Sequence, residues 1–539
     1  MVELTGNKNI STVTAVGIGT SDVSALVEQE EMKMKPWLPK KWDYEADVVI
    51  IGYGGAGASA AIAATDLGAD VLLLEKAPVG GGNTGCSGGG MRIPSNLSDA
   101  IKHYNALTMG TVDEESIRIL AKAIIELPDR LKDWGAELEY FQQQEPDYPS
   151  LPGSKSFYQI VSLARNARQK KEQKIIGGMW GAHGDQLFDF LDNQVARREI
   201  RIMYETPAKK LIQDFLTKEI LGVRVKSLGR EIYVKARRGV VLACGGFQNN
   251  KEMIVNFLPY TAQLPLYPWG TPYNTGDGII MALEVGAKLW HMTGIELGNF
   301  APRAPSEKYG VGFRLVRRLP VGSQAIYINK YGKRFMNESI LLSHRKELFE
   351  VQYFDHKRAE YPNIPFFMVF DEIFREKRPI VGMHSGWWCI HKLYEWSKDN
   401  SAEIEQGWII KANMLKELAE KIGADSDATE ETVHKYNEYC LAGNDPEFGR
   451  SIEWLVPIET PPYYATELCE PIINTQGGPK RNGKAQVLDK NEKPIPRLYA
   501  AGELGSFWDP LYETASNIPE ALAFGHIAGE QAAKLESWE

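Results

Sequence analysis

The sequence predicts an α/β fold, and three features of residues 47–76 carry this prediction. The apolar run DVVII (47–51) has the composition of a buried strand, and GYGGAG (52–57) follows it directly with the glycine spacing G-x-G-x-x-G. The small, apolar stretch AGASAAIAATDLG (56–68) predicts a helix packed closely on a sheet. A second buried strand is predicted over VLLLEK (71–76), which completes a β-α-β unit.

The glycine spacing has a physical reason in a dinucleotide-binding unit. Such a unit needs a tight turn, close approach of the backbone to a pyrophosphate and close helix-strand packing, and Gly52, Gly54 and Gly57 stand at those positions. Glu75 follows at the distance expected for a carboxylate that accepts hydrogen bonds from a ribose. A glycine-rich turn without a ligand is the alternative. The strand, the helix and the acidic residue together favour a bound dinucleotide.

Length, composition and charge indicate a globular enzyme. The 539 residues are 43% hydrophobic and 24% charged, and the net charge of −9 offers no attraction to nucleic acid or to an anionic membrane. No uncharged apolar stretch is long enough to span a membrane, and the first residues lack the pattern of a signal peptide, so we expect a cytoplasmic location. The five scattered cysteines form no C-x-x-C motif, so we expect no iron-sulfur cluster, c-type haem or disulfide framework, and the sequence predicts no metal-binding residues.

Three further glycine-containing segments indicate which dinucleotide is bound. GGGNTGCSGGG (80–90) concentrates backbone N–H groups and small polar side chains where a long cofactor could lie, which a nicotinamide-binding domain does not need. ACGGF (243–247) ends a predicted buried strand, and LYAAGE (498–503) precedes a predicted helix. We therefore expect the nucleotide-binding domain to contain segments from near the N-terminus and from near the C-terminus.

With TGDGIIMALEVGA (275–287) and GKRFMNE (332–338), these motifs resemble the FAD-dependent fumarate reductase/succinate dehydrogenase flavoprotein family from about residue 44 to the end. The resemblance implies a Rossmann-like FAD-binding domain of the glutathione-reductase type with an inserted α+β capping domain. Its expected divisions are an N-terminal extension (1–43), the FAD-binding domain (44–288 and 456–539) and the capping domain (289–455). Family members that bind FAD covalently use a histidine in the segment that here reads GGNTGCSGG, so we expect noncovalent FAD.

The motifs and the resemblance together give a set of expected cofactor-binding residues, which come from every part of the FAD-binding domain. They are Gly52, Gly54, Gly55, Ala56, Gly57, Glu75, Lys76, Gly82, Asn83, Thr84, Gly88, Gly89, Gly90, Ala208, Ala243, Gly245, Gly246, Asp277, Gly502, Glu503, Asn517 and Ile518.

The substrate positions depart from the family pattern. In fumarate reductases two histidines and two arginines hold the dicarboxylate, and the corresponding positions here are at Glu296 or Leu297, Asn474, Leu342 and Glu513. Such a site would lose several charge-assisted hydrogen bonds, each worth about 1.5–3 kcal/mol. We also expect Glu513 to repel an anionic substrate. The sequence therefore argues against a fumarate reductase.

Tyr512, next to Glu513, is similar to the tyrosine that the 3-ketosteroid dehydrogenase branch uses to polarise a substrate ketone. A polarised carbonyl makes the neighbouring C–H acidic and supplies driving force for hydride transfer to or from the flavin. The alternative is a core tyrosine whose hydroxyl bonds to the backbone. Ser516, His344 and Arg345 are secondary catalytic candidates, although SHRKELFE (343–350) also has the charge pattern of an exposed helix.

Three functions remain open from the sequence. The first is desaturation or reduction of a carbon-carbon bond next to the carbonyl of a neutral, cyclic or steroid-like substrate, with a separate electron donor or acceptor. The second is reduction of an α,β-unsaturated acid, in which Arg345 replaces the missing arginine. The third is an FAD-containing electron-transfer subunit, which the lack of a second redox centre disfavours.

Overall fold

The structure is a computed structural model. It describes residues 38–141, 145–164, 184–227, 229–259, 267–268, 270–298, 300–303, 324–339, 350–381, 384–385, 394–469 and 471–539. Within these residues, no helix has both the length and the apolarity that crossing a membrane requires.

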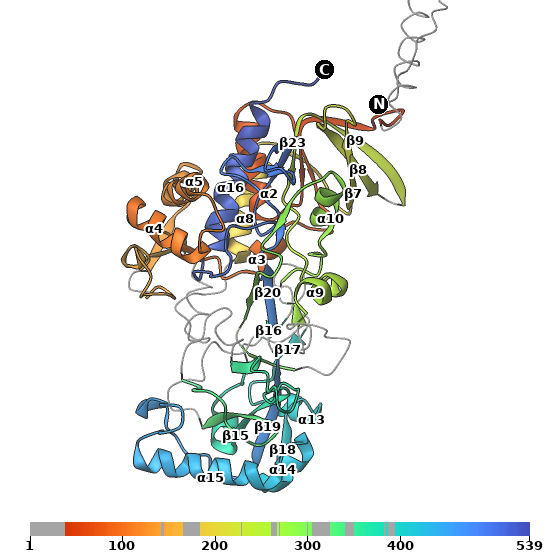
Figure 1. Cartoon of the computed structure of the whole chain (residues 1–539). Helices are drawn as coiled ribbons and strands as arrows, with labels where there is room; N and C mark the ends of the chain where they lie inside the picture. Colours follow the sequence, from red (N-terminus) through yellow and green to blue (C-terminus); the bar gives the residue numbers. More distant parts are fainter. Residues whose placement is uncertain are drawn as a thin grey trace, which may run out of the picture.

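A central sheet forms the upper half of the molecule (Figure 1). Its strand order is β22-β23-β9-β1-β2-β6, and every neighbouring pair is parallel except β22 with β23. The strands are β1 (Tyr44–Ile51), β2 (Val71–Leu74), β6 (Arg201–Met203), β9 (Arg230–Leu242), β22 (Gln486–Leu488) and β23 (Pro494–Ala500). Ile51 pairs with both Leu74 and Leu242, which brings the carboxyl ends of three strands to one edge. In open α/β sheets, ligands bind at this edge.

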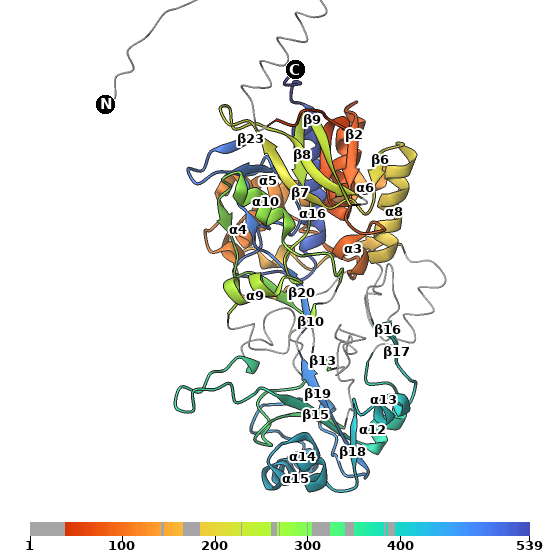
Figure 2. The ribbon, with the colours of Figure 1, turned by 90° about the vertical axis from the view of Figure 1, so that its right-hand side faces the viewer.

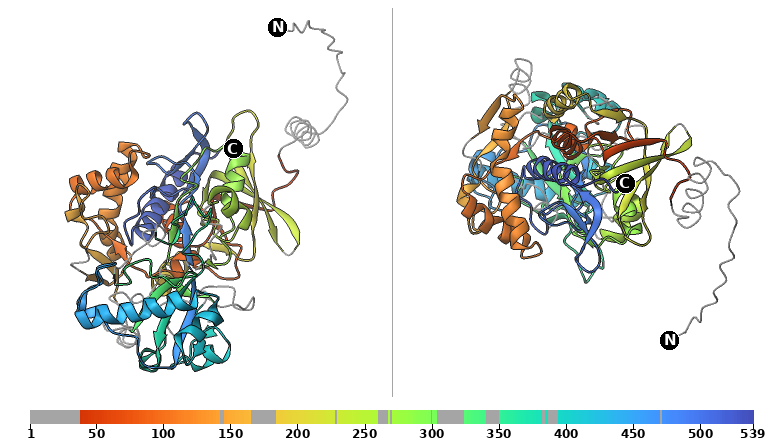
Figure 3. Two further views of the ribbon diagram at one scale, coloured as in Figure 1. Left: turned by 60° about the horizontal axis from the view of Figure 1, so that its bottom comes forward. Right: turned by 90° about the horizontal axis from the view of Figure 1, so that it is seen from above.

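Helices α2 (Gly55–Asp66) and α16 (Asn517–Ala533) lie side by side against this sheet (Figure 3). A Cβ atom on Gly525 or Gly529 would come within 2.3 or 2.1 Å of the carbonyl oxygens of Ala56 and Ala60. The two helices therefore touch backbone to backbone, and only glycine allows this approach. The first β-α-β unit is thus joined to the C-terminal helix.

An antiparallel meander of β7 (Ala208–Gln213), β8 (Ile220–Ser227) and β9 extends the central sheet. A small sheet has the order β3-β5-β4, from Met91–Arg92, Ile160–Leu163 and Leu138–Phe141. The helices of this half also include α3 (Gly82–Cys86), α4 (Leu97–Thr108), α5 (Glu114–Ile125), α6 (Leu127–Asp133), α8 (Gly184–Arg197), α9 (Lys251–Phe257) and α10 (Asp277–Glu284), with a 3-10 turn at Ser154–Ser156.

A second sheet, with the order β13-β19-β15-β14 and β18 paired to β19, lies at the opposite end of the molecule (Figure 2). Its strands are β13 (Ala301–Pro302), β14 (Ala325–Asn329), β15 (Phe366–Asp371), β18 (Ile410–Ala412) and β19 (Tyr463–Cys469). The helices of this half are α12 (Glu372–Lys377), α13 (Ser401–Glu405), α14 (Leu415–Ile422) and α15 (Ser426–Ala442), with a 3-10 turn at Ile452–Trp454 and a hairpin of β16 (His384–Ser385) and β17 (Tyr394–Glu395).

The two halves are connected by short sheets between them. Strand β20 (Pro471–Thr475) follows β19 and pairs with β10 (Tyr267–Pro268) and β12 (Ile295–Leu297), and β11 (Leu289–Trp290) pairs with β21 (Gly478–Pro479). This arrangement confirms the predicted α/β class with an inserted unit. The division at residues 43, 288 and 455 stays a prediction, and β19 belongs to the second sheet.

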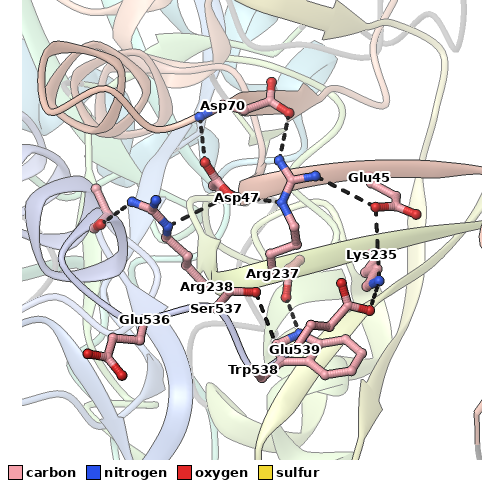
Figure 4. Close-up of polar contacts among 12 residues, drawn as sticks. Glu45, Asp47, Asp70, Lys235, Arg237, Arg238, Glu536, Ser537, Trp538 and Glu539 are labelled. Carbon is pink, nitrogen blue, oxygen red and sulfur yellow. Dashed lines mark hydrogen bonds and ion pairs between the residues drawn. The ribbon is translucent and has the colours of Figure 1, made fainter.

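A charged network closes the edge of the central sheet that lies away from the strand carboxyl ends (Figure 4). Arg237 Nε donates to Asp47 Oδ1 at 2.8 Å, and its Nη2 donates to Asp70 Oδ2 at 3.1 Å. Trp538 Nε1 donates to the Ala236 carbonyl oxygen at 2.7 Å, and Lys235 pairs with Glu539. The network thus fastens residues 538–539 to the sheet without contributing to the site at the other edge.

Candidate active site

The glycine loop after β1 is closed by two backbone contacts. Gly52 has φ +103°, and a Cβ there would lie 2.2 Å from the Ala243 carbonyl oxygen. On Gly57, a Cβ would lie 1.9 Å from the Gly52 carbonyl oxygen. Gly54 differs, because the nearest neighbour of its Cβ position is the Gly81 carbonyl oxygen at 3.7 Å. The protein needs glycine at 52 and 57 for its own packing, whereas a Cβ at Gly54, next to the N-terminus of α2, would make only ordinary van der Waals contacts, so packing does not require this glycine.

Glu75 ends the second parallel strand and lies against this loop. Its Oε2 accepts from the Tyr53 N–H at 2.7 Å, and its Oε1 accepts from the Ala77 N–H at 2.7 Å. Burial raises the pKa of the Glu75 carboxyl above its ordinary value. The adjacent Lys76 Nζ donates to Asp277 Oδ2 at 2.7 Å, so two expected cofactor residues that are distant in sequence meet here.

Glu503 collects donors from three distant segments. It accepts from the Gly246 N–H at 2.9 Å, from Asn83 Nδ2 at 3.1 Å and from Asn274 Nδ2, while Asn83 Oδ1 accepts from the Thr271 N–H at 3.1 Å. Withdrawal from water raises the pKa of the Glu503 carboxyl to about 7. These five residues are called the Glu503 cluster below. Glu503 and Asn83 are partly buried, whereas Thr271 and Asn274 are buried, and a carboxylate supported by amides suits a ligand with hydroxyl groups.

A second polar cluster lies at the N-terminus of α16. Asn517 Nδ2 donates to Asn474 Oδ1 at 3.1 Å, and Asn517 Oδ1 accepts from Gln476 Nε2 at 3.2 Å. Gln476 Nε2 also lies 3.3 Å from Glu296 Oε1, and the Asn517 N–H points to the Tyr512 hydroxyl at 3.5 Å. We call these five residues the Tyr512 cluster. They come from β12, from β20 and the residue that follows it, and from α16 and the segment before it, so the fold assembles the cluster where its two halves meet.

The Tyr512 hydroxyl is kept protonated by its surroundings. The side chain is 5% exposed, and burial together with the Glu296 charge raises the pKa of the phenol above its usual value. Near neutral pH, the phenol is therefore a hydrogen-bond donor and not a base. This is the protonation state that polarising a carbonyl requires.

At the N-terminus of α16 and in the Tyr512 cluster, two buried polar atoms that have no partner among the described residues bear on the site. They are Ser516 Oγ and Gln476 Oε1, and both side chains are 0% exposed. Unpaired buried polar atoms are uncommon in native structures because each forfeits its hydration.

Glu513 does not join the Tyr512 cluster, although it is the next residue. Its carboxylate lies 2.9 Å from His103 Nε2 and 3.6 Å from Arg92 Nε, and it accepts from the Asp147 N–H at 2.6 Å. Arg92, His103 and Glu513 are all 0% exposed. The expectation that Glu513 repels an anionic substrate is wrong, because its charge is neutralised inside the protein.

The remaining expected residues fall into two groups. Thr84 Oγ1 accepts from the Gly55 N–H at 3.0 Å, and a Cβ on Gly502 would lie 3.1 Å from Ala56 Cβ, so these residues gather around the glycine loop. Gly82 lies in α3, Gly88–Gly90 follow that helix, Ala208 begins β7, Ala243 and Gly245 follow β9, and Ile518 lies in α16. His344, Arg345 and Leu342 lie outside the described residues.

Apart from residues that contribute only a backbone N–H group, such as Thr271 and Asp147, four residues of these clusters and contacts were not singled out from the sequence. Asn274 donates to Glu503, Gln476 bridges Glu296 and Asn517, Arg92 forms an ion pair with Glu513, and His103 contacts the Glu513 carboxylate. Asn274 directly precedes the TGDG motif, which could have suggested it. No local pattern marks the other three.

Residues 47–518 match the family described as FAD binding domain. The chain belongs to this family. The expected family is therefore confirmed, and FAD is the cofactor of this flavin-dependent enzyme. The structure agrees, because packing within the protein does not require glycine at Gly54, and because Glu503 and Asn83 are partly exposed, which suits a pyrophosphate and a hydroxyl-bearing chain.

Curated relatives include proteins named as oxidoreductases of unsaturated acids and proteins named as steroid dehydrogenases. An NADH:acrylate oxidoreductase from Vibrio harveyi is 28% identical over 93% of this chain and 51% of its own length, so the chain spans about half of that protein. A urocanate reductase from Eggerthella lenta is 27% identical over 97% of the chain and 82% of the relative. A 3-oxosteroid 1-dehydrogenase from Mycolicibacterium smegmatis is 27% identical over 90% of the chain and 96% of the relative.

Solved structures of a steroid dehydrogenase and of a fumarate reductase share the fold of this chain. A 3-ketosteroid delta1-dehydrogenase from Sterolibacterium denitrificans aligns with a TM-score of 0.75 at 23% identity, over 91% of this chain and 99% of that one. The open conformation of a flavocytochrome c3 fumarate reductase aligns with a TM-score of 0.68 at 24% identity, over 94% and 81%. At these identities, the likeness establishes the fold alone.

Proposed function

We propose that this flavoprotein oxidises or reduces a carbon-carbon bond next to the carbonyl of a neutral, cyclic or steroid-like substrate. The observation that carries the proposal is the Tyr512 phenol, a buried donor whose pKa is raised, within a polar cluster at the N-terminus of α16. A phenol that stays protonated can donate to a carbonyl oxygen throughout the neutral range.

The charges of the Tyr512 cluster support a neutral substrate. Glu296 and Asn474 stand where the resemblance would place two histidines that bind a dicarboxylate, and both are buried. The Glu296 carboxylate is close enough to influence Tyr512, and it would repel a carboxylate bound beside that phenol. A neutral carbonyl compound avoids this repulsion and can use amide groups as partners.

Each side chain then has a defined role in the proposal. Tyr512 donates to the carbonyl oxygen and withdraws electron density, which makes the C–H bond next to the carbonyl more acidic. Gln476 Oε1 and Ser516 Oγ, both buried and without a partner among the described residues, orient the substrate by hydrogen bonds. FAD, when bound, supplies the hydride acceptor or donor.

The same proposal assigns residues to FAD. The loop at Gly54 and the N-terminus of α2 would bind the pyrophosphate, Glu75 a ribose, and the Glu503 cluster the hydroxyl-bearing chain. The N-terminus of α16, at Asn517 and Ile518, would face the flavin, and its partial positive charge stabilises electron density there. A separate electron donor or acceptor completes the cycle.

Reduction of an unsaturated acid is the second candidate function. It is favoured by the names of two relatives, the acrylate oxidoreductase and the urocanate reductase, and by the neutralisation of Glu513 by Arg92. Arg345 would then provide the cation for the carboxylate, as the sequence interpretation requires.

Matched substrates distinguish the two candidates. Oxidised protein is mixed without oxygen with cyclic ketones, and reduced protein with the corresponding enones and with fumarate, acrylate and urocanate, while the flavin absorbance is followed. The proposal predicts bleaching by a ketone or recovery of the oxidised spectrum with its enone, and no change with the acids. Flavin reoxidation by an acid but not by any enone would contradict it and support the second candidate.

A further inference from the structure

Arg481 and Glu520 form an ion pair that is withdrawn from water. Both residues are 1% exposed, and the Arg481 guanidinium donates to the Glu520 carboxylate. The guanidinium carbon also lies 5.0 Å from the ring centroid of Phe507 and 5.3 Å from that of Phe524. Removal of two charges from water is costly, and apolar side chains can often replace such a pair without loss of stability. A charged pair among aromatic rings therefore needs a reason other than packing.

Arg481 holds the backbone on both sides of Glu503. Its Nη1 donates to the carbonyl oxygen of Gly502 at 3.1 Å and to that of Leu504 at 3.2 Å. Because both carbonyl groups are directed to one nitrogen, the backbone dihedrals between them are restricted, and these dihedrals set the direction of the Glu503 side chain. That side chain extends to the Gly246 N–H, which donates to it at 2.9 Å. Arg481 therefore restricts the direction in which the Glu503 carboxylate can lie.

Glu520 holds the next part of the same loop. Its carboxylate accepts from the Ser506 hydroxyl at 2.7 Å and from the Phe507 N–H at 3.1 Å. Glu520 itself lies in the first turn of α16, three residues after Asn517 of the Tyr512 cluster. The ion pair thus fastens the loop that carries Glu503 to the start of α16.

Glu503 is accessible to a ligand, whereas Arg481 is not. Glu503 is partly exposed, and Arg481 is enclosed by the protein. We propose that Arg481 is a positioning residue for FAD, which directs the Glu503 carboxylate towards the cofactor by holding the carbonyl groups on both sides of it. The inference rests on the assignment of Glu503 to FAD proposed above, and it does not depend on the ketone substrate.

A double-mutant cycle on FAD affinity separates positioning from a general role in stability. The parent, Arg481→Lys, Glu503→Ala and the double variant are prepared as apoproteins and titrated with FAD, and the melting temperature of each is measured. Lysine keeps the positive charge next to Glu520 but lacks the planar fork of donors. The two substitutions should be non-additive in FAD affinity if Arg481 acts through Glu503.

The expected signature is a loss of affinity that requires the Glu503 carboxylate. Arg481→Lys should weaken FAD binding about tenfold in the parent. In the Glu503→Ala background, the same substitution should change the affinity by less than about twofold, since no carboxylate remains to be directed. A role in stability alone would not produce this dependence on Glu503.

Arg450→Lys is the matched control from the other half of the molecule. Arg450 is also a buried arginine, which pairs with Glu338 and donates to the Ala325 carbonyl oxygen at 2.9 Å. Its substitution should lower the melting temperature of the apoprotein and leave the FAD dissociation constant unchanged. If Arg481→Lys does not fold, Arg481→Met combined with Glu520→Gln replaces it in the same cycle, because this pair leaves no buried charge.

The possible failures of the proposal are distinguishable. An equal loss of FAD affinity with and without the Glu503 carboxylate, or no loss in either background, would overturn it, because Arg481 would then not act through Glu503. If Glu503→Ala alone binds FAD as tightly as the parent, the assignment of Glu503 to FAD is wrong, and the role of Arg481 falls with it.

Discussion

Glu503 and Glu513 precede the same helix, α16, but the protein neutralises them differently. Glu503 is partly buried and accepts from amide and backbone N–H groups, whereas Glu513 is fully buried between Arg92 and His103. The first arrangement leaves a carboxylate that can still accept from a ligand. The second uses the charge to join β3 and α4 to the segment that carries Tyr512. Glu503 is thus available to a ligand, whereas Glu513 stabilises the fold.

The largest predicted effects concern two glycines of the loop after β1: Gly57, which the packing of the protein requires, and Gly54, which is assigned to FAD. Gly57→Val places a side chain on the Gly52 carbonyl oxygen, so we expect a loss of about 3 kcal/mol or more of stability and no bound flavin. Gly54→Val meets only ordinary contacts in the protein, so it should fold with a near-parental melting temperature yet bind no FAD. Circular dichroism and the flavin content of the purified proteins measure both. Normal flavin content in Gly54→Val would remove the assignment of Gly54 to the cofactor.

The next largest effect concerns Glu513. Glu513→Ala leaves Arg92 buried without its carboxylate, which should reduce the free energy of unfolding by about 3–5 kcal/mol. Glu503→Gln, the matched change in the other region, keeps most hydrogen bonds and should mainly weaken FAD binding. Urea denaturation of the two apoproteins gives the comparison. Equal stability of Glu513→Ala and the parent would mean that the buried pair does not support the fold.

A smaller effect should appear in the pH dependence of the apoprotein. The pKa of Glu503 rises from 4.5 to about 7 on folding, so its contribution to stability is present below pH 4.5 and is lost as the pH rises through 7. The shift corresponds to about 3 kcal/mol, which partial exposure to solvent reduces to about 2. Relative to Glu503→Gln, the parent apoprotein should therefore lose about this much stability between roughly pH 4.5 and 7. Parallel stability curves for the two proteins would contradict the shifted pKa.

The sequence predicted those parts of the site that depend on local backbone geometry. The G-x-G-x-x-G turn, Glu75 at the end of the next strand and the start of α16 follow from short-range spacing, and the structure brings them to one edge of the sheet. This covers the α/β fold and the site around the glycine loop.

Partners that arise from distant segments could not be predicted in the same way. Arg92 and His103 contact Glu513 although they are more than 400 residues away along the chain, and no sequence motif marks that contact. The predicted electrostatic role of Glu513 was therefore wrong. Arg481 looks like an ordinary loop residue until its burial and its bonds to the carbonyl groups on both sides of Glu503 are known. The roles of Tyr512 and Ser516 remain proposals, as do those of His344 and Arg345, which lie outside the described residues.

The carbonyl proposal is tested most directly by the rate of flavin reduction in Tyr512→Phe, mixed anaerobically with a ketone that bleaches the parent. Removal of one hydroxyl should slow the reaction about 10²–10⁴-fold while FAD affinity is unchanged. Tyr499→Phe is the control, because that buried tyrosine lies in β23 and its hydroxyl faces the Gln531 carbonyl oxygen. A Tyr512→Phe protein that is reduced as fast as the parent would contradict the account.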